Sequence, residues 1–179
     1  MRHQAIAAAL ALLAFAACGS AEGRQSSGGS DAGGPGFEKD GFTLDWEITG
    51  DSMLVSISAP TTGWIAVGFH ATAAMKDADI LIGYVDASGA HLRDDFGTDY
   101  TRHQPDTELG GSSDFSGLEG SETGGVTTLS FVLPLSSGDS RDRPPVPGQP
   151  CSVILATGSD GNDSFGGMHQ WAETVELTF

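Results

Sequence analysis

Residues 63–69 have the sequence Gly-Trp-Ile-Ala-Val-Gly-Phe, and residues 74–83 have the sequence Ala-Met-Lys-Asp-Ala-Asp-Ile-Leu-Ile-Gly. Both segments are rich in aliphatic side chains, which favours two buried β-strands joined by a short loop. The loop carries Met75, a long thioether for which the local pattern gives no packing reason. These two strands, and the methionine between them, are the centre of the predicted fold.

Alternation of hydrophobic and polar residues predicts further strands on both sides. Residues 42–48 alternate in this way, and after a Gly50-Asp51 turn residues 53–57 do so again, which predicts a hairpin. About eight strands and no convincing amphipathic helix predict an all-β fold of the sandwich type. The remaining predicted strands are 64–69, 80–85, 91–96, 126–133, 151–156 and 175–179.

Two long segments contain few aliphatic residues. Residues 97–125 consist largely of Gly, Ser, Asp, Thr and Glu, so we expect a long loop of a kind that is usually functional or mobile. Residues 134–150 hold five prolines, which excludes the interior of a regular sheet.

The N-terminal residues have the pattern of a targeting signal. A short polar start precedes an apolar run, and small residues lead up to Cys18. Residues 1–17 are similar to a bacterial lipoprotein signal peptide, with Cys18 as the lipidated first residue of the mature chain; a plain secretory peptide is the alternative. Residues 18–36 are rich in Gly and Ser and predict a flexible tether, so the folded domain is expected to be 37–179.

The lipoprotein pattern predicts a location in the bacterial cell envelope. Acyl chains on Cys18, palmitate among them, would anchor the protein in the membrane. The outer membrane, the periplasmic face and the cell surface all stay open as positions. Cys151 would have no partner for an intrachain disulfide, and we expect a small buried thiol there.

The acidic composition limits the partners. The chain has 24 acidic and 8 basic residues and a formal net charge of −16. Such a surface repels nucleic acid, so no nucleic-acid partner is expected. No nucleophile elbow, P-loop or Cys-x-x-Cys-His motif occurs in the sequence.

Several motifs follow one another in a recognisable order. The segment Gly63–Phe69 is followed by Met75-Lys-Asp-Ala-Asp, by Asp94-Asp95 and by a late His169. This arrangement resembles the DOMON domain family, and the resemblance extends over residues 37–179. It implies an immunoglobulin-like antiparallel β-sandwich, a fold that in this family binds haem b or, in some members, sugars. The haem-binding branch, such as the cytochrome domain of cellobiose dehydrogenase, holds iron between an axial methionine and an axial histidine.

The resemblance assigns these axial positions to Met75 and His169, which would be the two metal ligands. A soft thioether and an imidazole suit electron transfer, because they fill both axial positions and favour the reduced iron. His70 is the second choice for the imidazole, and Met168 is the alternative thioether. The expected apolar lining of the site consists of Trp64, Phe69, Phe165, Met168 and Trp171.

The resulting hypothesis is an envelope-anchored electron-transfer module that is not itself an enzyme and exchanges electrons with an unidentified redox partner protein. The alternative is a β-sandwich without cofactor that binds a carbohydrate or a partner protein, with Trp64, Trp171 and Tyr84 available to stack on a sugar. Residues 158–163 resemble a calcium-type acidic turn but have no closing glutamate at the right spacing, so an ordinary Asp/Asn/Gly turn is favoured. His91 and His103 are expected to be exposed.

Overall fold

The computed structural model describes residues 36–179. The predicted signal peptide, the lipidation site Cys18 and nearly all of the tether lie outside this range. The described chain consists of eleven β-strands and one short 3-10 helix, which confirms the all-β prediction. Within residues 36–179 no helix has the length and apolar character needed to cross a bilayer.

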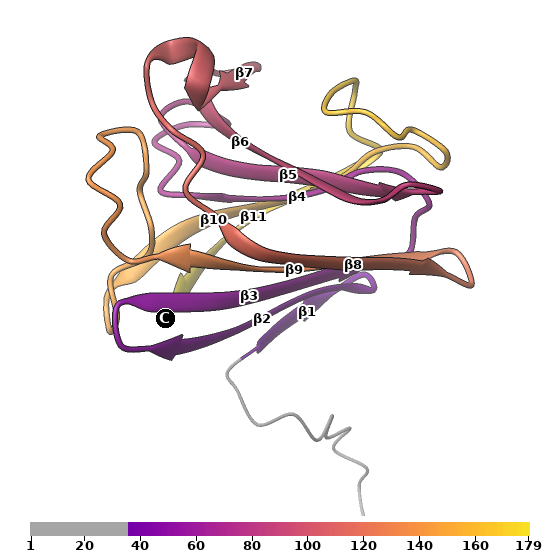
Figure 1. Cartoon of the computed structure of the whole chain (residues 1–179), viewed down its shortest axis with the longest axis horizontal. Coiled ribbons are helices and arrows are strands. Elements are labelled where there is room, and N and C mark those ends of the chain that lie inside the picture. The colour runs from indigo at the N-terminus through magenta and orange to yellow at the C-terminus, as the bar shows by residue number, and fades with distance from the viewer. Residues whose placement is uncertain (1–35) are drawn as a thin grey trace, which may run out of the picture. The chain divides into compact units, whose positions relative to one another are not determined.

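Two antiparallel sheets face each other, as Figure 1 shows, and the predicted antiparallel sandwich is therefore confirmed. Sheet I has the strand order β1-β2-β3-β9-β8, and sheet II has the order β11-β10-β4-β5-β6-β7. The strands of sheet I are β1 (Gly36–Lys39), β2 (Phe42–Thr49), β3 (Ser52–Ala59), β8 (Ser116–Thr123) and β9 (Val126–Pro134). Those of sheet II are β4 (Ile65–Phe69), β5 (Asp79–Asp86), β6 (Gly89–Asp99), β7 (Arg102–Pro105), β10 (Pro150–Thr157) and β11 (Trp171–Thr178).

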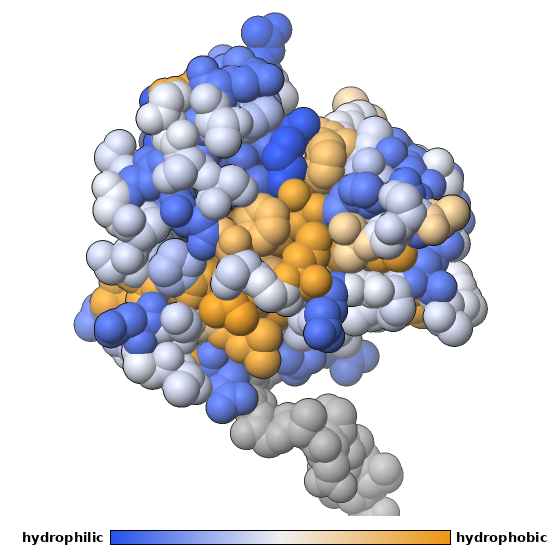
Figure 2. All heavy atoms as spheres, viewed as in Figure 1, coloured by the Kyte–Doolittle hydropathy of each residue, from blue (hydrophilic) through white to orange (hydrophobic). Residues whose placement is uncertain are grey.

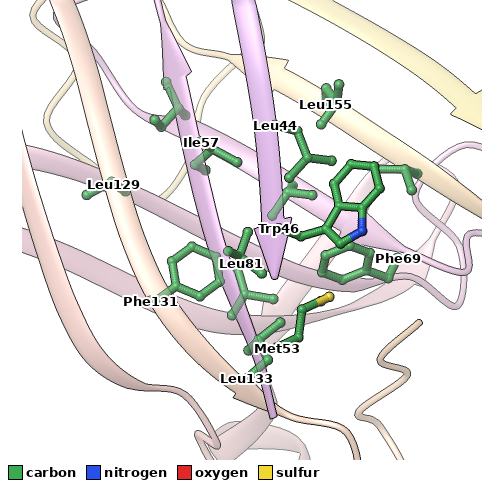
Figure 3. Packing of buried hydrophobic residues seen from close by; sticks show 14 of the residues in the cluster. Leu44, Trp46, Met53, Ile57, Phe69, Leu81, Leu129, Phe131, Leu133 and Leu155 are labelled. Atoms are coloured by element: carbon green, nitrogen blue, oxygen red, sulfur yellow. The ribbon is translucent and has the colours of Figure 1, made fainter. Parts of the chain in front are cut away.

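The main core lies between the two sheets. Leu44 and Ile57 from sheet I and Leu81 and Leu155 from sheet II are fully buried there (Figure 3). Burial of each such side chain contributes about 1.5–3 kcal/mol. Cys151 is buried in the same cluster as a free thiol, as the sequence predicted.

A second hydrophobic cluster lies on the outer face of sheet II. Its buried members include Trp64, Ala66, Ile80, Ile82 and Ala156. Successive residues of a strand point to opposite faces, so Ala66 turns away from the core to which Ile65 and Val67 belong. Sheet II therefore carries apolar side chains on both faces, where an antiparallel sandwich commonly has a polar outer face.

The prediction of a long loop at residues 97–125 was wrong. This segment contains the end of β6, the strands β7 and β8, and the 3-10 helix η1 (Asp106–Leu109). β7 and β8 are edge strands, each paired on one side only, and their side chains are largely exposed. Because they contribute little to the core, their sequences lack the hydrophobic alternation that identifies the inner strands.

Candidate ligand-binding site

The outer face of sheet II forms the floor of a cavity of about 1010 Å³. Ligand sites in proteins commonly have about 300–1,000 Å³, so the cavity is large enough for a macrocyclic cofactor. Small residues provide the space. Ala66 and Gly68 of β4 and Ala156 of β10 project little from the sheet, so the volume above its middle is left unfilled. Ile80 and Ile82 of β5 complete the apolar part of this floor.

Three segments far apart in the sequence form the walls. The loop 70–78 leaves sheet II at one end of β4, and the loop 158–170 leaves it at the other end; both stand above the sheet in Figure 1. The β6–β7 hairpin provides the third wall. Figure 2 shows hydrophobic residues gathered in the middle of the visible face, with hydrophilic residues on both sides.

The loop 70–78 brings Met75 to the cavity, and Gly97 of β6 makes its position feasible. The Asp77 N–H donates to the Gly97 carbonyl at 2.8 Å, and the Gly97 N–H donates to the Ala78 carbonyl at 2.8 Å. A Cβ at Gly97 would lie 2.7 Å from the Met75 carbonyl carbon, so only glycine permits this approach. Met75 lines the cavity and is partly buried.

A second anchor of this loop is Arg143. Its guanidinium donates to the Asp77 carbonyl at 2.9 Å and to the His70 carbonyl at 3.5 Å, near the two ends of the loop. Within the loop, the Thr72 hydroxyl donates to the Asp77 carboxylate at 2.7 Å. The methionine is therefore presented by a loop held from both sides.

The loop 158–170 brings His169 to the same cavity. Asn162 organises it, since its carbonyl accepts the Trp64 N–H at 3.1 Å and its side-chain amide donates to the Gly166 carbonyl at 3.0 Å. Gly158 packs against the Trp64 indole, where a Cβ would collide with the ring. The acidic turn 158–163 belongs to this loop, and its Asp160 carboxylate accepts the Thr62 N–H at 3.1 Å.

The structure thus brings Met75 and His169, 94 positions apart in the sequence, to one cavity. Of the residues predicted to line the site, Trp64, Phe165 and Met168 also do so. The buried indole Nε1 of Trp64 has no hydrogen-bond partner among residues 36–179, which leaves a donor next to the cavity. Met168 is 81% exposed, so its side chain stands at the rim.

Two of the predicted lining residues point to the other face of sheet II. Phe69 is fully buried in the main core (Figure 3). Its ring packs edge-on against Phe179. Trp171 packs on the same core and stacks on Phe42. Both predictions are corrected by strand alternation, since the cavity is lined by Gly68 and Ala172, the neighbours of these aromatic residues.

The histidines also differ from expectation. His70, the second choice for an imidazole ligand, does not line the cavity. His103, expected to be exposed, is partly buried at the cavity wall and bonds to the Asp95 carboxylate through Nδ1. His91 stacks on Tyr84 and bonds to Asp86.

A polar group missed from the sequence lies at one edge of the cavity. Asp95 is fully buried and accepts two hydrogen bonds from Arg93, at 2.6 and 2.7 Å, in addition to the contact with His103. These bonds hold the pKa of Asp95 below its usual range against the opposing effect of burial. Arg93 also donates to the Phe165 carbonyl at 3.1 Å and lies over the Phe165 ring. Arg102 lines the cavity beside them.

A group of carboxylates lies on the inner side of sheet II, near the end where the loop 70–78 begins. Burial, and next the charge of Asp79, raise the pKa of Asp94 to about 8. Burial likewise raises the pKa of Asp79 to about 7 and that of Asp106 to about 6. Asp142 also has a raised pKa, again chiefly because of burial.

Fold and site together define a β-sandwich whose outer sheet face carries a large apolar cavity, bordered by a thioether, an imidazole and basic side chains. The profile of the DOMON domain family matches residues 38–158, and the chain belongs to this family.

Two solved structures have similar folds. One is the cytochrome b domain of pyranose dehydrogenase from Coprinopsis cinerea, with a TM-score of 0.60, 17% sequence identity and 80% of each chain covered. The other is the cytochrome domain of Myriococcum thermophilum cellobiose dehydrogenase, with a TM-score of 0.52, 12% identity and 80% of each chain covered. At these identities the likeness establishes the fold of the chain.

Proposed function

We propose that this domain binds haem b in the cavity on sheet II, with Met75 and His169 as axial ligands, and serves as an electron-transfer module. The observation that carries the proposal is the position of these two side chains on the walls of one cavity with an apolar floor. The likeness to two cytochrome domains supports it.

The residues around the cavity fit the chemistry of haem. Haem has an apolar macrocycle and two acidic propionates, so it needs an apolar slot with a basic or wet edge. The floor of Ala66, Ile80 and Ile82 provides the apolar surface. Arg102 and the one-third-exposed Arg93 place guanidinium N–H donors at the edge, with Asp95 balancing the charge of Arg93, in a protein with a net charge of −16.

Haem bound between a thioether and an imidazole supplies a one-electron couple whose iron is closed to other ligands. The side chains of the chain itself fix the properties of that couple. Met75 presents a soft ligand that favours the reduced state, and the apolar floor keeps water away from the macrocycle. Two hydrogen bonds to the Asp95 carboxylate fix the orientation of the Arg93 guanidinium at the edge of the cavity.

The wider setting is also part of the proposal. An electron-transfer module needs a redox partner, and the acidic surface favours a partner protein with a basic docking face. Lipidation of Cys18 would hold both proteins in the same envelope layer. The domain would then carry electrons without catalysing a reaction of its own.

Reconstitution of the full chain with hemin tests the proposal. We expect stoichiometric uptake, a Soret band, and sharp α and β bands on reduction, as six-coordinate low-spin haem produces. Met75→Ala should leave haem bound through the imidazole and convert the spectrum to a high-spin form. His169→Ala should lose most of the haem.

Matched controls come from an imidazole and a thioether that lie outside the cavity. His70→Ala removes the second-choice imidazole, and Met53→Leu removes the thioether of a core methionine while conserving its volume; both should retain the wild-type spectrum. A chain that takes up no hemin would refute haem binding, whereas unchanged spectra in both ligand variants would refute the assignment of Met75 and His169.

A further inference from the structure

Three aspartates from separate parts of the chain meet at one end of the sandwich. Asp94 belongs to β6, Asp106 begins η1, and Asp142 lies in the loop between β9 and β10. One carboxylate oxygen of each lies within 4.8 Å of the corresponding oxygens of the other two. In Figure 1 this loop and η1 lie towards the same end of the molecule.

Asp94 and Asp106 are buried, Asp142 is partly buried, and one carboxylate oxygen of each has no hydrogen-bond partner among the described residues. Asp94 is 5% exposed and Asp106 is 1% exposed. The Oδ1 atoms of Asp94, Asp106 and Asp142 are all inaccessible to water and have no hydrogen-bond partner among residues 36–179. Buried polar atoms in folded proteins are rarely left unpaired, and a bound ion is one of the recognised reasons for an apparent exception.

The basic side chains in this region are engaged elsewhere. The Arg141 guanidinium donates to the Leu109 carbonyl at 2.6 Å, and that of Arg143 donates to the carbonyls of His70 and Asp77. Within the described part of the chain, none of the four ion pairs involves the three aspartates. The cluster therefore forms no ion pair with a basic side chain of residues 36–179, and the nearby charge of Arg141 offsets only part of the rise in the pKa of Asp106.

We propose that Asp94, Asp106 and Asp142 form a binding site for a hard divalent cation, with Ca²⁺ as its preferred ion. Ca²⁺ binds oxygen at about 2.3–2.6 Å, so two of its ligands lie at most about 4.6–5.2 Å apart. The mutual limit of 4.8 Å for the three oxygens meets this condition. The remaining coordination positions would be taken by water or by backbone carbonyls, which the flexible geometry of Ca²⁺ allows.

The surroundings give the site a defined shape. Asp114 and Asp139 form a second such group with Asp142, so the two groups share one carboxylate. The Asp139 carboxylate also accepts the N–H groups of Ser112 at 2.6 Å and Arg141 at 2.9 Å, and these bonds tie the loop that carries Asp142 to the segment that follows η1. The Asp114 N–H donates to the Asp94 carboxylate at 3.1 Å, which joins the two groups.

The site can be tested without haem. The full chain is freed of metal with chelator and titrated with Ca²⁺ at neutral pH by isothermal calorimetry, with Tm followed in parallel. We expect one Ca²⁺ per chain, and at 100 times Kd a rise in Tm of about 5 °C or more. Mg²⁺ should bind at least about tenfold more weakly, because it demands near-ideal octahedral geometry and gives up its water reluctantly.

Variants separate this site from the other acidic turn. Asp106→Asn and Asp142→Asn should each weaken Ca²⁺ binding at least about tenfold, with Tm in chelator unchanged or raised, because a repelling charge has been removed. Asp163→Asn removes a carboxylate from the turn 158–163 and should bind Ca²⁺ as the wild type does.

The opposite results would overturn the proposal. A wild-type chain that binds no Ca²⁺ at millimolar concentration would do so, and so would wild-type affinity in both Asp106→Asn and Asp142→Asn. Loss of binding in Asp163→Asn alone would move the ion to the other turn. Because Asp142 lies in a partly exposed loop, its variant remains informative if Asp106→Asn fails to fold.

Discussion

Gly97→Ala tests how the structure positions Met75. The new Cβ would lie 2.7 Å from the Met75 carbonyl carbon, whereas ordinary contacts begin at 3.4 Å. The Met75 peptide would have to retreat by at least about 0.7 Å, which exceeds the ~0.5 Å within which a functional site must be held. We therefore expect Met75 to lose its position over the cavity.

The stability change can be estimated from the same contacts. Inserting a methyl group into a packed site destabilises by about 1–3 kcal/mol. The two hydrogen bonds that join Gly97 to the loop, both 2.8 Å long, are worth about 0.5–1.5 kcal/mol each and would be strained. If both bonds are lost, the sum is a decrease of about 2–6 kcal/mol in the free energy of unfolding, measurable by urea denaturation.

The decisive readout is the spectrum of the hemin-reconstituted variant. Gly97→Ala should show the high-spin form expected of Met75→Ala, although its methionine is intact. Gly50→Ala is the control, because Gly50 has φ +60° in the β2–β3 turn and open space around its Cβ. It should lose about 1–2 kcal/mol of stability and keep the low-spin spectrum. A low-spin, fully stable Gly97→Ala variant would refute this account of the Met75 loop.

Three further outcomes follow from the structure. Ala66→Leu places three carbons into the cavity, so hemin titration should show an affinity at least tenfold lower, with little change in stability. Val67→Ala, on the core face, should lose about 1–3 kcal/mol in denaturation and still bind hemin. Asp95→Asn should destabilise the chain by about 2–3 kcal/mol, because it breaks the ion pair between Arg93 and the fully buried Asp95. The loss is moderated because the Arg93 side chain is one-third exposed. Wild-type stability in urea would contradict this prediction. In chelator, the free energy of unfolding should fall as the pH rises from 5 to 8. Asp106, Asp79 and Asp94 have raised pKa values of about 6, 7 and 8, so over this range the folded chain holds more protons than the unfolded one. A free energy of unfolding that rises over this range would contradict the prediction.

The inner strands were predictable because hydrophobic and polar residues alternate along their sequences. Residues 42–48 and 53–57 alternate in the sequence, and they form β2 and β3 with Leu44 paired to Ile57 in the core. β7 and β8 were missed because these two edge strands bury few side chains, whereas the edge strand β11 packs Val175 and Leu177 on the core and alternates accordingly. The polar composition of β7 and β8 follows from their exposed position in the sheet, and that position cannot be deduced from the local sequence.

The site was predictable in part. The resemblance to a family identified Met75 and His169, because no periodicity relates two loops 94 residues apart. The face of each aromatic residue could have been deduced, since Phe69 is five positions from Trp64 and an odd separation along a strand reverses the side. The same rule places Arg93 and Asp95 on one face. That they meet His103 depends on the pairing of β7 with β6, which only the structure shows.

The short segment 93–97 of β6 connects the two proposed sites, and strand alternation keeps them apart. Asp95 points outward to the basic edge of the cavity, while its neighbour Asp94 points inward to the aspartate cluster. Two residues further on, Gly97 accommodates the loop of Met75. Because a shift of one residue in register reverses every side chain of a strand, a single insertion before Arg93 would bury the basic edge and expose the cluster. β6 therefore tolerates substitution at its exposed end far better than any change of length.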